Sequence, residues 1–180
     1  MAESGVVTLR PGTHDDIAAF VGLGRAVVPP SYGPIDAAYA QRMLDEWWTP
    51  EVFATSLARN THLVAERDGE LVALASFGRL TASYRDFPHV SGEREVMWKL
   101  YVHPDHQGLG IGSRLLGEVE ALVEGDELWL EVVDGNEQAF AFYGAHGFEE
   151  VERVSDDHYP DDVWLCKRLG KRLLSEDGLR

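Results

Sequence analysis

The stretch LYVHPDHQGLGIG, residues 100–112, decides the fold of this chain. Mostly large side chains at 96–102 predict a strand, His103–Leu109 is expected to form a loop, and residues 110–124 show the apolar face of a helix. Glycines between a strand and a helix let backbone N–H groups approach an anion, and the helix N-terminus adds partial positive charge. The sequence therefore predicts a cradle for a diphosphate group.

Two familiar phosphate-binding loops do not match this cradle. The loop of nucleoside triphosphatases ends in Gly-Lys-Ser or Gly-Lys-Thr, whereas Gly112 is followed directly by Ser113. The dinucleotide fingerprint GxGxxG, counted from Gly108 and Gly110, requires a third glycine at position 113. A triphosphatase and a Rossmann-type dinucleotide enzyme are therefore disfavoured.

The rest of the chain predicts strands in hairpins first and strands separated by helices later. Asp68-Gly69 is a strong signal for a two-residue hairpin turn, and Pro29-Pro30 is expected to end a helix that begins at Thr13. Further helices are expected at 37–47, 50–60 and 137–145, and further strands at 6–10, 62–67, 71–79, 128–133, 148–154 and 162–169. This order predicts an α/β fold, with a mixed sheet of about seven strands and helices on both faces. We expect one domain over 1–169 and a tail at 170–180.

The composition is that of an acidic globular protein. The 180 residues carry a formal net charge of −15, which disfavours binding to nucleic acid or to an anionic membrane surface. The charge favours a cationic partner, and it is equally well explained as keeping the protein soluble. The single cysteine, Cys166, excludes a disulfide framework and a multi-thiolate metal site. With neither a signal-peptide pattern nor a membrane-length apolar run, the sequence predicts a cytoplasmic protein.

A second sequence block follows the glycine loop: residues 136–148 are NEQAFAFYGAHGF. Together the two blocks resemble the GNAT superfamily of acyl-CoA-dependent N-acyltransferases, over about residues 95–150. The resemblance implies acetyl-CoA as co-substrate, no metal, and direct attack of an amine on the thioester without an enzyme nucleophile. A non-catalytic CoA-binding regulatory module on the same fold is the alternative.

The resemblance also implies which residues hold the acetyl donor. The strand before the loop would pair with the pantetheine arm through Leu100, Tyr101 and Val102. The short helix of the second block would contribute Asn136, Phe140 and Tyr143. The pyrophosphate would rest on the loop residues Gln107, Gly108, Leu109, Gly110, Ile111, Gly112 and Ser113.

Two groups are candidates for moving protons. The family's tyrosine on the short helix maps onto Tyr143, and a phenol with a pKa near ~10 can protonate a leaving thiolate. Glu131 is the candidate base, because it alternates with Trp129 and Val133 on a central strand, where partial desolvation raises a carboxyl pKa. Its stretch looks like the N-terminal-alanine acetyltransferases of ribosomal proteins, whose base lies 12 residues before the tyrosine. Glu95 is a rival base, which a β-bulge would have to bring onto the right face.

The resemblance also implies that the acceptor enters on the side opposite CoA, at an entrance walled by the first helices and by the loop joining the last two strands. Tyr32 in the stiff segment PPSYGPI and Tyr159 in the segment HYP are expected to line that entrance. Between 149 and 162, seven acidic residues face only one basic residue, Arg153, which favours a cationic amine. The acceptor could be a protein N-terminus, a lysine or a small molecule, and a homodimer remains open.

Overall fold

The computed structural model describes residues 5–80, 94–155 and 158–170. Within these ranges the strands form one sheet in the order β1-β2-β3-β4-β5-β7-β6. The strands are β1 (Val7–Pro11), β2 (Thr61–Arg67), β3 (Glu70–Leu80), β4 (Arg94–Val102), β5 (Glu127–Val133), β6 (Glu149–Val154) and β7 (Asp162–Arg168). The predicted α/β fold with a mixed seven-stranded sheet is therefore confirmed. Of the tail expected at 170–180, residues 171–180 lie outside the described residues, and so do residues 81–93.

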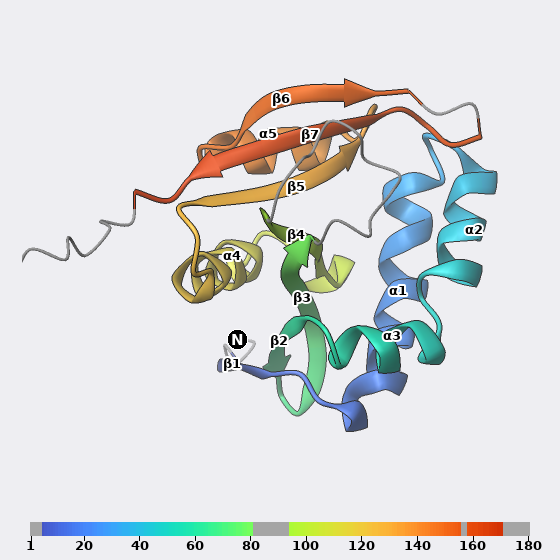
Figure 1. Ribbon diagram of the computed structural model, residues 1–180. Coiled ribbons are helices and arrows are strands. Elements are labelled where there is room, and N and C mark those ends of the chain that lie inside the picture. The colour runs from blue at the N-terminus through green and yellow to red at the C-terminus, as the bar shows by residue number, and fades with distance from the viewer. Residues whose placement is uncertain (1–4, 81–93, 156–157, 171–180) are drawn as a thin grey trace, which may run out of the picture.

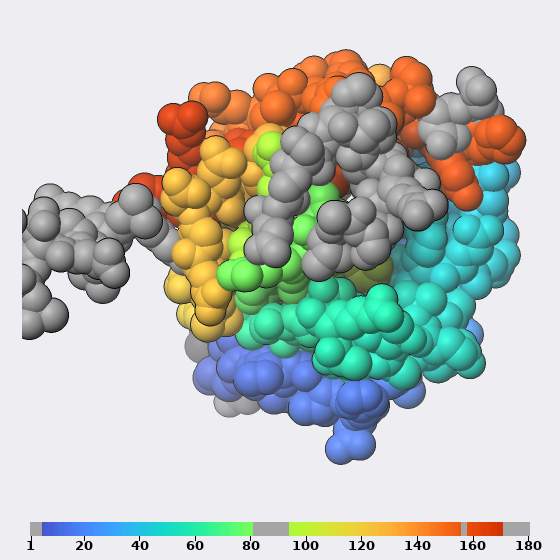
Figure 2. All heavy atoms as spheres, viewed as in Figure 1, coloured from blue at the N-terminus to red at the C-terminus, as the bar shows by residue number. Residues whose placement is uncertain are grey.

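Helices cover both faces of the sheet (Figure 1). One face carries α1 (Ile17–Tyr32), α2 (Ala37–Glu46) and α3 (Pro50–Leu57), and the other carries α4 (Ile111–Leu122) and α5 (Glu137–Ala145). Short 3₁₀ turns, η1 (His14–Asp16) and η2 (Pro104–His106), precede α1 and the glycine loop. Figure 2 shows α2 and α3 on one side of the molecule and β6 along its upper rim.

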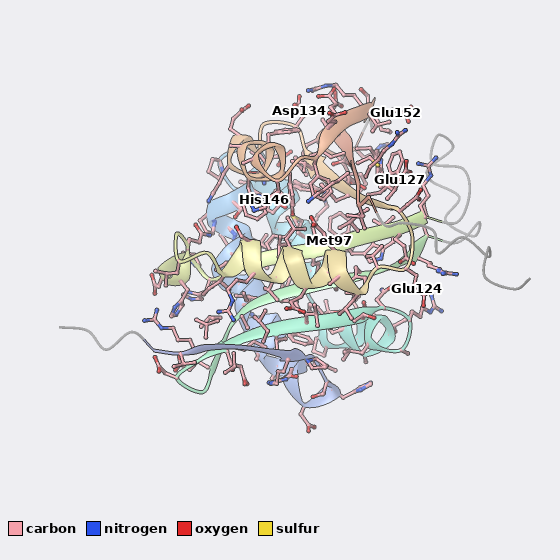
Figure 3. All side chains as sticks on the ribbon, turned by 90° about the vertical axis from the view of Figure 1, so that its left-hand side faces the viewer. Met97, Glu124, Glu127, Asp134, His146 and Glu152 are labelled. Atoms are coloured by element: carbon pink, nitrogen blue, oxygen red, sulfur yellow. The ribbon has the colours of Figure 1, made fainter. Side chains whose placement is uncertain are left out.

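Each face has its own apolar core, because alternate residues of the central strands point in opposite directions. On the α4 face, Leu115 and Val119 of the helix pack with Met97 of β4. Figure 3 looks onto this face, with α4 in front of the strands and running roughly along them. On the α1 face, Phe20 packs with Val64 of β2 and its neighbours. The sheet is thus fixed on both sides, which is the rigid base that the site requires.

Strands β4 and β5 pair over only a short distance. They are parallel neighbours, and their register consists of Val96 opposite Trp129 and Met97 opposite Leu130. Beyond Met97 the two strands separate, and a register shift opposite Ser76 and Phe77 of β3 leaves Trp98 as the extra residue of a bulge. The sheet is therefore open between the C-terminal halves of β4 and β5.

The first helix is longer than the sequence predicted. Pro29 and Pro30 were expected to end it, but α1 continues through both prolines to Tyr32. The two prolines lie in its last turns, where their fixed φ still suits a helix and only two N–H donors are lost. The carbonyl of Pro29 still accepts a helical hydrogen bond, from Gly33 N–H at 2.9 Å. This extension carries Tyr32 to the edge of the opening between β4 and β5.

The hairpin turn predicted at Asp68-Gly69 is confirmed, with φ of 54° at Asp68 and 84° at Gly69.

Gly24 lets α1 pack closely against Trp48. A Cβ at this position would overlap the indole ring of Trp48, whereas a Cβ at Gly22, on the outer face, would meet nothing within 4 Å. We expect Gly24→Ala to lower the free energy of unfolding by about 1–3 kcal/mol through overpacking. Gly22→Ala, the matched control, should raise it by roughly 0.5–1 kcal/mol, because alanine favours a helix. Urea denaturation of both variants measures this, and a stabilised Gly24→Ala would contradict the packing assigned to Trp48.

In the described ranges, no helix has the length and apolarity that crossing a bilayer demands.

Candidate active site

The opening between β4 and β5 is a groove with a cavity of about 350 Å³. Its walls come from α1, from both separating strands, from the glycine loop with the start of α4, and from α5. Segments far apart in the sequence therefore meet in one hollow. Most of the residues predicted to bind the donor line it: Leu100, Tyr101, Val102, Gln107, Gly108, Gly110, Ile111, Gly112, Ser113, Asn136 and Tyr143.

The glycine loop forms one end of the groove and suits an anion. Gly108 and Gly110 both have a φ of 74°, in the left-handed region, and a Cβ at either would meet nothing within 4 Å. Since α4 begins at Ile111, the first N–H groups of the helix have no partner within it. Gln107 braces the loop by donating from Nε2 to Val102 O at 3.1 Å. The loop thus presents backbone donors with space in front of them, as a pyrophosphate requires.

A histidine ties the start of α4 to the end of α5. His146 Nε2 lies 2.9 Å from Ser113 Oγ, and its Nδ1 lies 2.7 Å from Phe142 O. His146, directly after the end of α5, is labelled in Figure 3 above the start of α4. This contact holds together the two sequence blocks that carry the family resemblance.

The wall formed by β4 offers backbone groups to an extended ligand. His103 N–H donates to Val72 O of β3 at 2.8 Å, so by strand alternation the N–H groups of Leu100 and Val102 point away from β3, into the groove. Because β5 has diverged here, no strand in the described sheet pairs with them. An extended pantetheine arm fits this edge as an added strand would.

Glu131 lies on β5, with its side chain open to the groove. Asp162 at the start of β7 stands on the same sheet face, because its direct partner in the register is Val133, two residues from Glu131. The two carboxyl groups are hydrogen-bonded to each other. Desolvation by the surrounding protein and the negative charge of Asp162 together raise the pKa of Glu131 to about 9.

Tyr143 comes from α5 and is 9% exposed. Its ring packs edge-on against Phe142 and Phe148, with ring centroids 5.2 and 5.5 Å away. Burial, with a smaller contribution from Tyr32, raises the pKa of its phenol well above the usual value. The hydroxyl of Tyr143 therefore keeps its proton at neutral pH, as a proton donor must.

Three tyrosines from separate elements lie at the groove or beside it. The hydroxyls of Tyr32 on α1 and Tyr101 on β4 are 2.8 Å apart. Tyr32 is also hydrogen-bonded to the side chain of Asn136, which caps α5 by accepting from Ala139 N–H at 3.2 Å. Tyr39 on α2 packs edge-on against Tyr32 with ring centroids 5.9 Å apart. Tyr32 thus lines the groove, and its predicted role at the acceptor entrance stays a prediction.

Four predicted site residues lie outside the cavity lining. Leu109 points outward and is 55% exposed, while Phe140 packs against the core beneath α4. Tyr159 packs on Tyr39 and Trp47 beside the groove, with ring centroids about 6.1 Å away in both cases. Glu95 lies before the point where β4 and β5 separate, and its carboxylate accepts from Arg79 Nε at 3.2 Å. The bulge at Trp98 does not bring Glu95 into the groove.

The acidic residues between 149 and 162 do not gather in one place in the fold. Glu149, Glu150 and Glu152 lie on β6, an edge strand, where Glu150 is paired with Arg153 at 2.7 Å. Asp156 and Asp157 lie outside the described residues. Of the residues in this stretch that the structure describes, Asp162 is the one whose carboxyl group contacts Glu131.

Sequence reasoning missed one charged residue of the groove. Lys99 lines the cavity from β4, and desolvation lowers its pKa to about 8. Its Nζ lies 5.4 Å from the ring centre of Trp48 and 5.8 Å from that of Phe53. A lysine inside a strand of large residues was the available signal, but the bulge next to it determines which face it takes.

A model of the acetyltransferase (GNAT) family matches residues 26–148. The chain belongs to the GNAT acetyltransferase family. The N-alpha-acetyltransferase RimI of Mycobacterium tuberculosis is 33% identical over 136 residues, which cover 68% of this chain and 80% of the relative. The L-amino acid N-acyltransferase MnaT of Escherichia coli is 36% identical over 88 residues, 48% of each chain.

Solved structures agree on the fold. The PaiA N-acetyltransferase of Thermoplasma acidophilum, determined in complex with coenzyme A, superposes with a TM-score of 0.74. It is 20% identical, and the match covers 91% of this chain and 99% of that one. The family and the loop geometry together identify this GNAT protein as an acetyl-CoA-dependent N-acetyltransferase. Across the described residues, no three His, Cys, Asp or Glu side chains gather as a metal site.

Proposed function

We propose that this enzyme transfers the acetyl group of acetyl-CoA to a primary amine by direct attack, with Glu131 as base and Tyr143 as acid. One observation carries the proposal: both side chains line the cavity that the glycine loop closes at its other end. They come from β5 and α5, elements that the sheet and the His146 contact hold in place. A module that only bound CoA would need neither of these groups.

Each group has a separate task. Acetyl-CoA supplies the acetyl thioester and departs as the thiol. Glu131 removes a proton from the amine, which makes its nitrogen nucleophilic. The inward N–H groups of β4 are donors for the negative charge that develops on the carbonyl oxygen. Tyr143 gives its hydroxyl proton to the leaving sulfur, and the second proton that the attacking nitrogen loses as the amide forms restores the phenol.

The acceptor end favours a cationic amine. Glu131 and Asp162 are the acidic groups there, and Tyr32, Tyr39 and Tyr101 supply rings and hydroxyls. A peptide N-terminus, a lysine side chain and a small amine all present a primary ammonium ion. The name of the RimI relative supports an α-amino group, and that of the MnaT relative supports a free amino acid.

A panel assay tests the proposed function. The purified protein is incubated with acetyl-CoA and, separately, with tripeptides, a lysine peptide, amino acids and polyamines, while released thiol is followed. We expect thiol release above the rate of acetyl-CoA hydrolysis with one acceptor class, and acetylated product of matching mass. Tight CoA binding without turnover on any acceptor would instead favour the non-catalytic module.

Two further expectations stay predictions: the cytoplasmic location and the domain limits at residues 1–169. The sequence left open whether the protein forms a homodimer.

A further inference from the structure

We propose that Asp162 is a positioning residue, which holds Glu131 in the groove and shares one proton with it so that the pair takes up the acceptor as an ammonium ion. This inference rests on the proposed function, because it describes how the base of that reaction works. It starts from the strand order β5-β7-β6, in which the beginning of β7 lies beside the C-terminal end of β5.

The geometry makes the two carboxyl groups a pair. Asp162 and Glu131 are diagonal neighbours on one face of antiparallel strands, and Trp164 occupies the place directly opposite Glu131. Trp164 is fully buried, so the backbone that sets this register is fixed. The two carboxyl groups are close enough to share a hydrogen bond, and two carboxyl groups form one only while the pair holds a proton.

The surroundings determine the charge of the pair. Tyr32 on α1, Tyr39 on α2 and Tyr101 on β4 are neutral, because burial raises the pKa of each phenol above its usual value. Tyr143 on α5 is neutral for the same reason. The nearby cations are Arg42 on α2 and Lys99 on β4. The positive charge of Arg42 partly offsets the rise in the pKa of Tyr39, and its side chain donates to His158 O at 2.7 Å. The side chain of Lys99 lies against Trp48. Neither forms an ion pair with Glu131 in the described structure.

At neutral pH the pair therefore holds one proton and carries one negative charge. An ammonium ion is attracted to it, and the added positive charge favours release of the shared proton to water. A carboxylate of the pair then accepts a proton from the acceptor: one N–H bond breaks, one O–H bond forms, and a neutral amine is left. The pair returns to its singly protonated state, ready for the next cycle once the acetylated product has left.

The experiment titrates Glu131 directly by carbon-13 NMR of side-chain carboxyl groups, in the protein without substrates. Glu131→Gln identifies the signal. In Asp162→Asn we expect the midpoint of Glu131 to fall by about one pH unit or more, because the neighbouring negative charge is gone. Asp161→Asn is the matched control: it removes the same charge one residue earlier, where the carboxylate accepts from Ser155 Oγ at 3.1 Å. It should leave the midpoint unchanged.

The kinetic arm uses the best acceptor of the panel. In Asp162→Asn the acidic limb of kcat/KM should move to lower pH together with the NMR midpoint, a shift that a merely structural role would not produce. If Asp162→Asn does not fold, Asp162→Ala removes the same charge. An unchanged Glu131 midpoint in a folded variant overturns the inference, whatever the kinetics show. A shifted midpoint in a protein that acetylates no amine supports the carboxyl pair and contradicts the proposed function instead.

Discussion

Glu131→Gln is expected to reduce kcat/KM for the best amine by about 10²- to 10⁴-fold, the usual contribution of a general base. In the wild-type enzyme, kcat/KM should rise with pH up to about pH 9, because the base form of Glu131 appears only above its raised pKa. Glutamine cannot titrate, so this acidic limb should disappear. Steady-state assays between about pH 6 and about pH 10 measure both effects.

A matched control is available on the same strand. Glu127 lies at the start of β5, where its carboxylate accepts from Trp129 Nε1 at 3.1 Å, outside the groove. Glu127→Gln removes the same charge and should leave the pH profile unchanged. Loss of activity in Glu95→Gln, with Glu131→Gln active, would transfer the base role to Glu95.

Glu131→Gln should also change how the stability of the protein depends on pH. The folded pKa of Glu131 is raised above its usual value of 4.5 to about 9, so the folded state binds more protons than the unfolded state between these values. Stability is then lost as pH rises through that window. Glu131→Gln escapes this loss, and its Tm relative to wild type should increase steadily from pH 5 towards about pH 9. A constant difference in Tm would contradict the raised pKa.

Tyr143→Phe is expected to reduce kcat by about 10²-fold or more while leaving the affinity for CoA nearly unchanged. The substitution removes the proton donor alone, because a phenylalanine ring keeps the edge-on contacts with Phe142 and Phe148. Calorimetric titration with CoA and steady-state kinetics on the same preparation separate the two effects. If CoA affinity fell in proportion to kcat, the hydroxyl would be holding the ligand rather than delivering a proton.

Local sequence signals predicted most of the sheet and helices because their physical causes are local. The αL-compatible pair Asp68-Gly69 marks a hairpin, and Asn136 marks the start of α5 because its side chain caps that helix. The orientation of Glu131 followed from simple alternation with Trp129 and Val133 on β5. The predicted end of α1 at Pro29-Pro30 was wrong, because the helix continues through both prolines to Tyr32.

The second carboxylate could not be predicted in the same way. Asp162 appeared in the sequence as one of several acids in a polar segment. Its contact with Glu131 exists because β7 inserts between β5 and β6, which is a long-range pairing that local periodicity does not encode. Lys99 was missed for a related reason, because the bulge at Trp98 is a property of the pairing of β4 with β3.

The parting of β4 from β5 divides the groove into two halves that respond differently to mutation. The donor half is built from main-chain groups of β4 and the glycine loop, which most side-chain substitutions at Leu100 or Val102 leave in place. The acceptor half depends on side chains, among them Tyr32, Glu131 and Asp162. A single codon change can therefore alter which amine is acetylated while the use of CoA persists, so this scaffold can acquire new acceptors without losing its donor.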